Sequence, residues 1–323
     1  MYCAAGCFSS TPVLADLPLT IEDLLTAQQR WRLELGLVYA NSDITGVESA
    51  QPLLIQTGPT QFVSVLTAIG EQRRNSDTLV VSPGLRYGWS GDTELYGRFS
   101  ALSTTTRYSG GGGARSQTDD RLADGWLGIN HRFIREGATP ALLGFLEVAA
   151  AENTAASGTQ LVHGKAWLTG FTTYRAIDPL VLATTVAYRR SLSREVNEQS
   201  TAPGDLFLLS PSVSFAVNNE VTLITGLQWR WQEADQRDGQ DVGIRTTNTS
   251  LNLGLGHAWS QRLTLNVNSR SDISGRGGSE IQFTALYKLG ELPKRQREKS
   301  KEVKAEHVQE QPPVKSVTDE AKK

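Results

Sequence analysis

Residues 207–232 read FLLSPSVSFAVNNEVTLITGLQWRWQ and contain two alternating stretches joined by a short polar turn. The first stretch has an apolar side chain at every second position and serines between several of them. The second alternates apolar and aromatic side chains with Gln228, Arg230 and Gln232. A period of two puts successive side chains on opposite faces of a strand. The segment therefore predicts a β-hairpin with one apolar and one polar face.

The same period extends in both directions and predicts an all-β chain. Twelve stretches carry it: 31–44, 77–89, 93–107, 121–134, 141–152, 163–176, 179–191, 205–217, 221–233, 245–259, 261–271 and 279–289. Each has about 11 to 15 residues, which is enough for the 9 to 11 residues that a tilted strand needs to cross a bilayer.

The turns between these stretches alternate between short and long. Ser90-Gly91-Asp92, Ile177-Asp178-Pro179 and Asn218-Asn219-Glu220 are short, whereas 108–120 and 191–204 are long and rich in Gly, Ser and Asp. Outer-membrane barrels have short periplasmic turns on one rim and long outer loops on the other. We therefore predict a transmembrane antiparallel barrel of about twelve strands over residues 31–289. Residues 61–69 also resemble a strand, but they would break the alternation and are placed in the first outer loop.

The composition agrees with a barrel and excludes membrane helices. The 323 residues are 39% apolar, their mean hydropathy is -0.30, and no run approaches the roughly 18 apolar residues of a spanning helix. The mean hydropathy of a barrel averages an apolar lipid-facing half and a polar lumen-facing half, so it stays close to that of a soluble protein. A net charge of -2 gives no electrostatic case for nucleic acid. Aromatics near the predicted strand ends suggest interfacial girdles: Tyr39, Tyr87, Trp89, Tyr174, Tyr188, Trp229, Trp231, Trp259 and Tyr287.

The polar face of each predicted strand would line the lumen, and this face is mainly basic. It contains Arg32, Arg86, Arg98, Arg132, Lys165, Arg175, Arg189, Arg230, Arg262, Arg270 and Lys288, against Glu34, Glu94, Asp124 and Glu147. Fixed positive charge would favour anions or acidic polypeptide segments in transit. Alternatively, the arginines pair with the carboxylates and hold the interior together; the sequence leaves both interpretations open.

The two ends differ from the body. Residues 1–15 end in Val13-Leu14-Ala15 and resemble the remnant of a secretory signal peptide. Residues 16–30 predict a short amphipathic helix, with Thr20 as N-cap, Asp23 three residues on, and Ile21, Leu24, Leu25 and Gln28 on one stripe. Such a helix would plug the barrel mouth or dock in the periplasm. Residues 290–323 are charged, lack aromatics and predict a disordered periplasmic tail.

No motif in the chain predicts an enzyme, a metal site or a cofactor. Both cysteines, Cys3 and Cys7, lie in the first ten residues, so the barrel region has no thiol. None of the four histidines lies in an HExxH motif. By parity, His131 and His257 would face lipid near the rims. We therefore predict no catalytic residues and no metal ligands.

Several runs resemble the secretion-channel barrel of bacterial functional-amyloid (Fap) systems, which belongs to a group named after the meta-pathway of phenol degradation. They are Ile55–Phe62, Leu85–Gly88, Asp92–Tyr96, Pro140–Phe145, Thr173–Pro179 and Pro211–Val217. The resemblance implies a twelve-stranded outer-membrane barrel that passes amyloid subunits to the surface and is plugged by an N-terminal helix, here Leu19 to Arg30. That channel also has a periplasmic coiled coil that drives trimer formation, and no heptad region precedes the helix here.

These observations lead to one main and two alternative predictions of function. The main one is an outer-membrane channel that exports a polypeptide, in contact with outer-membrane lipid and its cargo, with no nucleic acid partner and with homo-oligomerisation left open. The first alternative is a passive channel for small aromatic or anionic solutes. The second is a surface-binding or structural barrel with a closed lumen.

Overall fold

The computed structural model describes residues 25–44, 47–48, 53–58, 61–65, 70–71, 73–110, 113–153, 162–196, 199–274 and 278–290. The predicted signal remnant, most of the predicted helix and the predicted tail beyond Gly290 lie outside these residues. Within them, no helix has the length and apolarity needed to cross a membrane.

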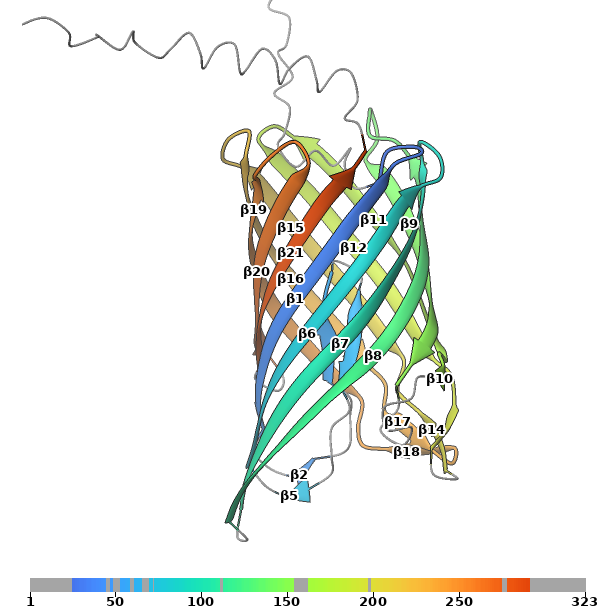
Figure 1. Cartoon of the computed structure of the whole chain (residues 1–323), viewed down its shortest axis with the longest axis vertical. Helices are drawn as coiled ribbons and strands as arrows, with labels where there is room; N and C mark the ends of the chain where they lie inside the picture. Colours follow the sequence, from blue (N-terminus) through green and yellow to red (C-terminus); the bar gives the residue numbers. More distant parts are fainter. Residues whose placement is uncertain are drawn as a thin grey trace, which may run out of the picture. The chain divides into compact units, whose positions relative to one another are not determined.

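The described residues form a closed antiparallel barrel, which confirms the predicted fold (Figure 1). The twelve wall strands are β1 (Trp31–Ile44), β6 (Arg73–Gly88), β7 (Thr93–Gly110), β8 (Gly113–Ile134), β9 (Ala141–Glu152), β11 (Ala166–Ile177), β12 (Leu180–Ser191), β15 (Leu206–Ala216), β16 (Val221–Gln232), β19 (Thr246–Ala258), β20 (Leu263–Ser274) and β21 (Gly278–Leu289). The barrel closes where β1 pairs with β21, Trp31 lying opposite Leu289. A two-residue strand, β10 (Val162–His163), pairs with the end of β9.

Strand parity sorts the side chains as the sequence predicts. In β1, the odd positions from Trp31 to Tyr39 are exposed on the outside, whereas Arg32, Glu34, Val38 and Ala40 are buried inside. Exposed leucines, valines and aromatics continue around the outer wall. A continuous apolar outer surface of this kind is stable only against lipid, so the barrel spans a membrane.

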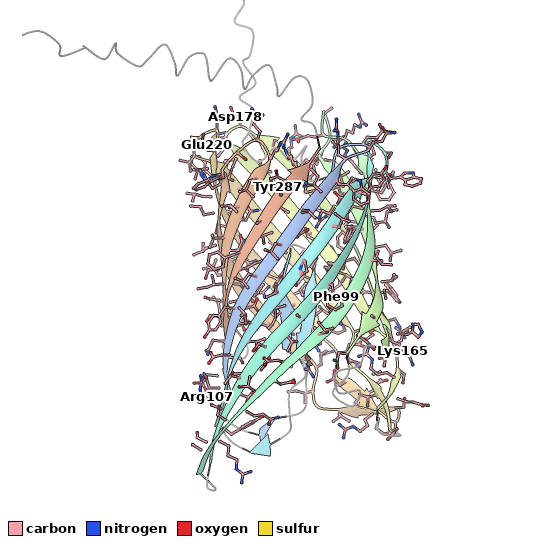
Figure 2. The ribbon with its side chains drawn as sticks, in the orientation of Figure 1. Phe99, Arg107, Lys165, Asp178, Glu220 and Tyr287 are labelled. Atoms are coloured by element: carbon pink, nitrogen blue, oxygen red, sulfur yellow. The ribbon has the colours of Figure 1, made fainter. Side chains whose placement is uncertain are left out.

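The two rims differ in the way that the turns predict, and Figure 2 marks them with Asp178 and Glu220 at one end and Arg107 and Lys165 at the other. The short-turn rim carries the connections 89–92, 135–140, 178–179, 217–220 and 259–262. At the long-loop rim, two connections meet in a separate sheet of β13 (Arg194–Val196), β14 (Gln199–Ala202), β17 (Asp235–Arg237) and β18 (Gln240–Val242).

One segment predicted as an outer loop is instead a continuation of two wall strands, and another pair of strands is longer than predicted. β7 and β8 remain paired as far as Gly110 and Gly113, so residues 108–110 and 113–120 belong to strands and not to a loop. β20 ends at Ser274 and β21 begins at Gly278, so both strands extend beyond the predicted ends at 271 and 279. Hydroxyl groups support the polar extension, with Thr105 Oγ1 lying 3.1 Å from Thr118 Oγ1 across the ribbon. Threonine has high strand propensity, so a polar stretch continues the ladder beyond the lipid.

The first long connection does not stay outside the barrel. It contains two strand pairs, β2 (Val47–Glu48) with β5 (Gly70–Glu71), and the hairpin of β3 (Leu53–Gln56) with β4 (Phe62–Val65). Figure 1 shows the β3–β4 hairpin in blue within the barrel. Residues 62–65 are therefore not a wall strand, in agreement with the prediction, but they lie in the lumen rather than in an exposed loop.

Candidate functional site

The lumen is lined by the charged side chains that parity predicts. Among the residues given above as lumen-lining, those with less than a tenth of their surface exposed are Arg32, Glu34, Glu94, Arg98, Asp124, Glu147, Arg189 and Arg270. Arg86 and Arg230 share the inward phase of their strands and are partly buried. The inner wall therefore combines arginines and carboxylates, most of them withdrawn from bulk water.

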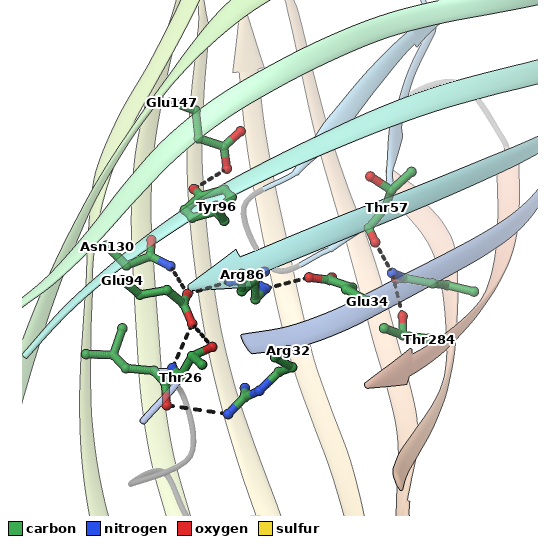
Figure 3. A network of polar contacts seen from close by, with 12 residues as sticks. Thr26, Arg32, Glu34, Thr57, Arg86, Glu94, Tyr96, Asn130, Glu147 and Thr284 are labelled. Carbon is green, nitrogen blue, oxygen red and sulfur yellow. Dashed lines mark hydrogen bonds and ion pairs between the residues drawn. The ribbon is translucent and has the colours of Figure 1, made fainter. Parts of the chain in front are cut away.

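Ion pairs join many of these groups, which favours the second of the two interpretations of the arginines. Arg86 is central: its Nε lies 2.6 Å from Glu34 Oε2 and its Nη1 lies 2.8 Å from Glu94 Oε1 (Figure 3). Arg98 and Arg270 also pair with carboxylates, on Glu147 and Glu280 respectively. Because carboxylates pair with Arg86, Arg98 and Arg270, the lumen is not uniformly positive.

Tyr96 lies flat on this wall and connects two of the charged groups. Its hydroxyl donates to Glu147 Oε1 at 2.7 Å, and the Arg86 guanidinium lies 4.9 Å from its ring centroid. A Cβ atom at Gly128, on the neighbouring strand, would come within 2.3 Å of the Tyr96 ring. Glycine at position 128 therefore leaves the space in which the ring lies.

Four of the predicted lumen residues lie elsewhere, and three of them are exposed. Lys165 and Arg262 are exposed in connections at opposite rims, and Arg175 is exposed on the outer face of β11. In the same strand Tyr174, predicted for the outer girdle, is 4% exposed and points inward. The phase of β11 is therefore opposite to the prediction: Leu168, Gly170 and Tyr174 face the lumen.

Arg132 lies at the short-turn rim rather than within the lumen. Its Nε lies 2.9 Å from Asp92 Oδ1, and Arg135 Nη2 lies 2.7 Å from the other oxygen of the same carboxylate. Hydrogen bonds from Arg135 and then Arg132 lower the pKa of Asp92 to about 2. The carboxylate therefore stays ionised at neutral pH and ties the 89–92 turn to the end of β8.

Residues 25–30 enter the lumen from the short-turn rim, and they are not helical. Leu25 packs on Ala141, Leu143 and Tyr174. The backbone N–H of Thr26 donates to Glu94 Oε2 at 2.7 Å, and the Thr26 hydroxyl donates to the same oxygen (Figure 3).

The backbone of this segment is also fixed to the barrel wall. Gln28 forms a parallel bridge with Gly88, whose N–H donates to Arg30 O at 3.0 Å. A Cβ atom at Gly88 would lie 2.1 Å from Ala27 O, so the close approach requires glycine. The backbone of residues 26–30 forms its hydrogen bonds with Glu94 and Gly88 instead of within a helix. For this reason the predicted helix does not continue through Leu25 and Gln28. The other predicted helix residues, Thr20, Ile21, Asp23 and Leu24, lie outside the described residues.

Apolar side chains anchor the β3–β4 hairpin to two parts of the lumen wall. Ile55 and Val63 are fully buried in a cluster with Val38, Ala40, Val80, Leu102 and Ala123 of β1, β6, β7 and β8. Phe62, 2% exposed, packs into a second cluster on the adjoining part of the wall, formed by Trp126, Phe145, Ala149, Ala166, Leu168, Ala187, Leu206 and Leu208 of β8, β9, β11, β12 and β15. The lumen wall is therefore apolar where the hairpin meets it.

Polar contacts attach the turn of the hairpin to the remaining wall. The Gln56 side-chain carbonyl accepts hydrogen bonds from Gln228 Nε2 and Arg270 Nη1, and the Thr57 carbonyl accepts one from Gln282 Nε2. Arg98 Nη2 donates to the Phe62 carbonyl at 3.4 Å. With these contacts the hairpin crosses the lumen and narrows it at this level.

The lumen is thus obstructed twice, by residues 25–30 near the short-turn rim and by the β3–β4 hairpin further in. Sequence reasoning missed the hairpin residues Ile55, Gln56, Thr57, Phe62 and Val63. One signal was present: the first long connection contains two apolar runs, Leu53–Ile55 and Phe62–Val65, unlike the Gly- and Ser-rich outer loops. Within the described ranges, no group of three His, Cys, Asp or Glu side chains could hold a metal ion.

The Arg86 ion pairs are expected to stabilise the barrel. Arg86→Leu would leave Glu34 and Glu94 without their shared cation, and breaking such a buried pair costs about 3 kcal/mol. We expect the variant to lose its folded mobility on SDS gels at a clearly lower temperature than the parent. Arg175→Leu, which removes an exposed arginine from the outer face of β11, is the matched control. Equal melting temperatures for the parent and the Arg86 variant would contradict this role.

No family model matches the chain, and no curated protein matches it. Its fold is similar to that of solved outer-membrane proteins. The COG4313 outer membrane channel from Pseudomonas putida F1 is 12% identical with a TM-score of 0.57, over 83% of this chain and 98% of that chain. The P. putida toluene transporter TodX is 10% identical with a TM-score of 0.42, over 86% and 94%. The translocator domain of the autotransporter NalP from Neisseria meningitidis is 10% identical with a TM-score of 0.48, over 84% and 93%.

The fold and its apolar outer surface define the class of this protein. It is an outer-membrane β-barrel with the architecture of channel proteins, set in lipid and obstructed inside by its own chain.

Proposed function

We propose that the chain is a passive outer-membrane channel for small aromatic or anionic solutes and not an enzyme. The observation that carries this proposal is the chemistry of the obstructed level, where an apolar wall around Trp126 and Phe145 lies beside Arg98 and Arg189. Apolar surface with a few fixed charges is typical of sites that bind small organic molecules.

The way in which the hairpin is held also favours small solutes. Its polar anchors are side-chain hydrogen bonds to Gln228, Arg270 and Gln282, which water can replace when the hairpin moves. A small solute requires only a local shift of the hairpin. An unfolded polypeptide would require the hairpin and residues 25–30 to leave the lumen together.

Flux into proteoliposomes tests the proposal. Benzenesulfonate, which is charged at all relevant pH values and does not cross lipid, should enter liposomes that contain the folded protein faster than glucose does. Empty liposomes and liposomes with heat-unfolded protein are the controls. If neither solute enters, the small-solute function is wrong and a closed structural barrel is favoured.

Export of a polypeptide, plausible from the Fap-like runs, is the second candidate. One observation bears on it: residues 55–58, 61 and 62, which belong to one of these runs, lie at the end of the lumen hairpin, and the implied plug segment includes residues 25–30, which enter the lumen. Loss of a surface polypeptide after deletion of the gene, with benzenesulfonate flux absent from proteoliposomes, would favour export. Flux without any secretion defect would favour the small-solute channel.

A further inference from the structure

We infer that the wall contacted by Phe62 is a binding site for aromatic carboxylates, and that the hairpin occupies this site in place of the ligand. The inference rests on the proposed function and specifies its solute. The site has an apolar part, formed by Trp126, Phe145, Leu168, Leu206 and Leu208, and a charged part, formed by Arg98 and Arg189.

The apolar part already holds an aromatic ring. Phe62 is 2% exposed and belongs to the same buried cluster as Trp126 and Phe145. The ring comes from an inserted hairpin and not from a wall strand, so it can leave without disturbing the ladder of the barrel. Withdrawal of the hairpin would expose a ring-sized apolar patch inside the lumen, and a ligand ring would cover it again.

The carboxylate of the proposed ligand would take the place of the Phe62 carbonyl oxygen. That carbonyl oxygen accepts a hydrogen bond from Arg98 Nη2 at 3.4 Å. An aromatic ring with an oxygen acceptor a few atoms away is the shape of a benzoate or a phenylacetate. A carboxylate is a better acceptor for a guanidinium than a neutral carbonyl, because charge-assisted hydrogen bonds are about twice as strong.

Arg189 supplies a cation that no carboxylate of the described residues approaches within ion-pair distance. It is 7% exposed, its guanidinium lies 5.5 Å from the Trp126 ring centroid, and its Nε and Nη1 atoms have no hydrogen-bond partner among the described residues. Trp126 Nε1, on the ring that both guanidinium groups approach, is likewise without a hydrogen-bond partner in the described part of the chain. Buried donors left unsatisfied are costly, and a ligand oxygen would satisfy them.

Nearby carboxylates limit the charge that the site accepts. Asp124 Oδ1 lies 3.8 Å from Arg98 Nη1, and Glu147 Oε2 lies 3.4 Å from Arg98 Nη2. Glu152 is paired with Arg194, its Oε1 lying 2.9 Å from Arg194 Nε. The three arginines and three carboxylates of this group cancel in formal charge, and Asp124 attracts Arg189 without coming within ion-pair distance of it. The site therefore has no excess positive charge, and it can take one carboxylate only through the unsatisfied donors of Arg189 and Trp126.

Titration calorimetry on the folded protein in detergent tests the inference without requiring transport. The probes are benzoate, neutral benzyl alcohol and acetate. Phe62→Ala vacates the apolar part and should strengthen binding of benzoate and benzyl alcohol several-fold, because the competent state is then more populated. In that background, Arg189→Gln should weaken benzoate at least tenfold and leave benzyl alcohol unchanged, whereas Asp124→Asn should strengthen benzoate only.

Arg175→Gln, on the outer face, is the control and should change none of the affinities. If Phe62→Ala does not fold, a chain with residues 53–65 replaced by a Gly-Ser linker exposes the same wall and takes its place. Benzoate binding that is absent from the vacated site, or insensitive to Arg189→Gln, would overturn the inference. Benzenesulfonate flux without benzoate binding would support the channel function and contradict the binding site. Benzoate binding without flux would support the binding site and contradict the channel function.

Discussion

Replacing residues 53–65 with a short Gly-Ser linker should raise the single-channel conductance in planar bilayers several-fold. The hairpin contacts β1, β6, β7 and β8 through Ile55 and Val63, the adjoining strands through Phe62, and β16, β20 and β21 through Gln56 and Thr57. Its removal exposes the full width of the lumen at that level to water and ions. The barrel should still form, because none of its wall strands pairs with β3 or β4.

A control deletion separates an effect of the lumen from an effect of shortened loops. Residues 236–241 belong to the outer sheet of β13, β14, β17 and β18, which is separate from the barrel sheet. Replacing them with the same linker should leave the conductance close to that of the parent. Conductance that is unchanged after removal of residues 53–65 would mean that ions pass beside the hairpin, and the hairpin would then not be the constriction.

The strands could be predicted because lipid imposes one simple rule on them. Every second residue of a wall strand faces hydrocarbon, so the order of residues alone reveals the phase, as in β1, where Leu33, Leu35 and Leu37 are all exposed outward. In β11 the predicted inward and outward positions were wrong. Phe171 and Tyr174 are three positions apart in this strand and cannot share a face. A strand with an aromatic residue on each face gives no decisive period.

For the interior, the sequence predicts which residues face the lumen but not which of them contact one another. Parity placed Arg86, Glu34 and Glu94 inside the barrel, but their pairing depends on the register between strands. The position of Thr26 depends on Glu94, which is 68 residues away. Helical spacing in residues 20–28 is a local signal, and a distant carboxylate overrides it at Thr26. Likewise, nothing local distinguishes an apolar outer loop from one that folds inward.

Locking the hairpin in place should abolish solute flux. In a Cys3→Ser/Cys7→Ser background, Gln56→Cys and Gln228→Cys place thiols on two side chains whose amides are hydrogen-bonded across the lumen. A bifunctional methanethiosulfonate linker of matching length would join the hairpin to β16. Benzenesulfonate flux into proteoliposomes should then fall to the level of empty liposomes and return after reduction with dithiothreitol.

The controls for the lock are the two single-cysteine variants and a second cross-linked pair. Thr105→Cys and Thr118→Cys face each other on the exposed β7–β8 ribbon, so joining them should not change the flux. The shift in gel mobility of the unfolded chain reports how complete each cross-link is. Full cross-linking of positions 56 and 228 with undiminished flux would mean that solutes pass while the hairpin stays in place. The Phe62 site would then lie beside the permeation path, since a fixed hairpin cannot vacate it during each passage.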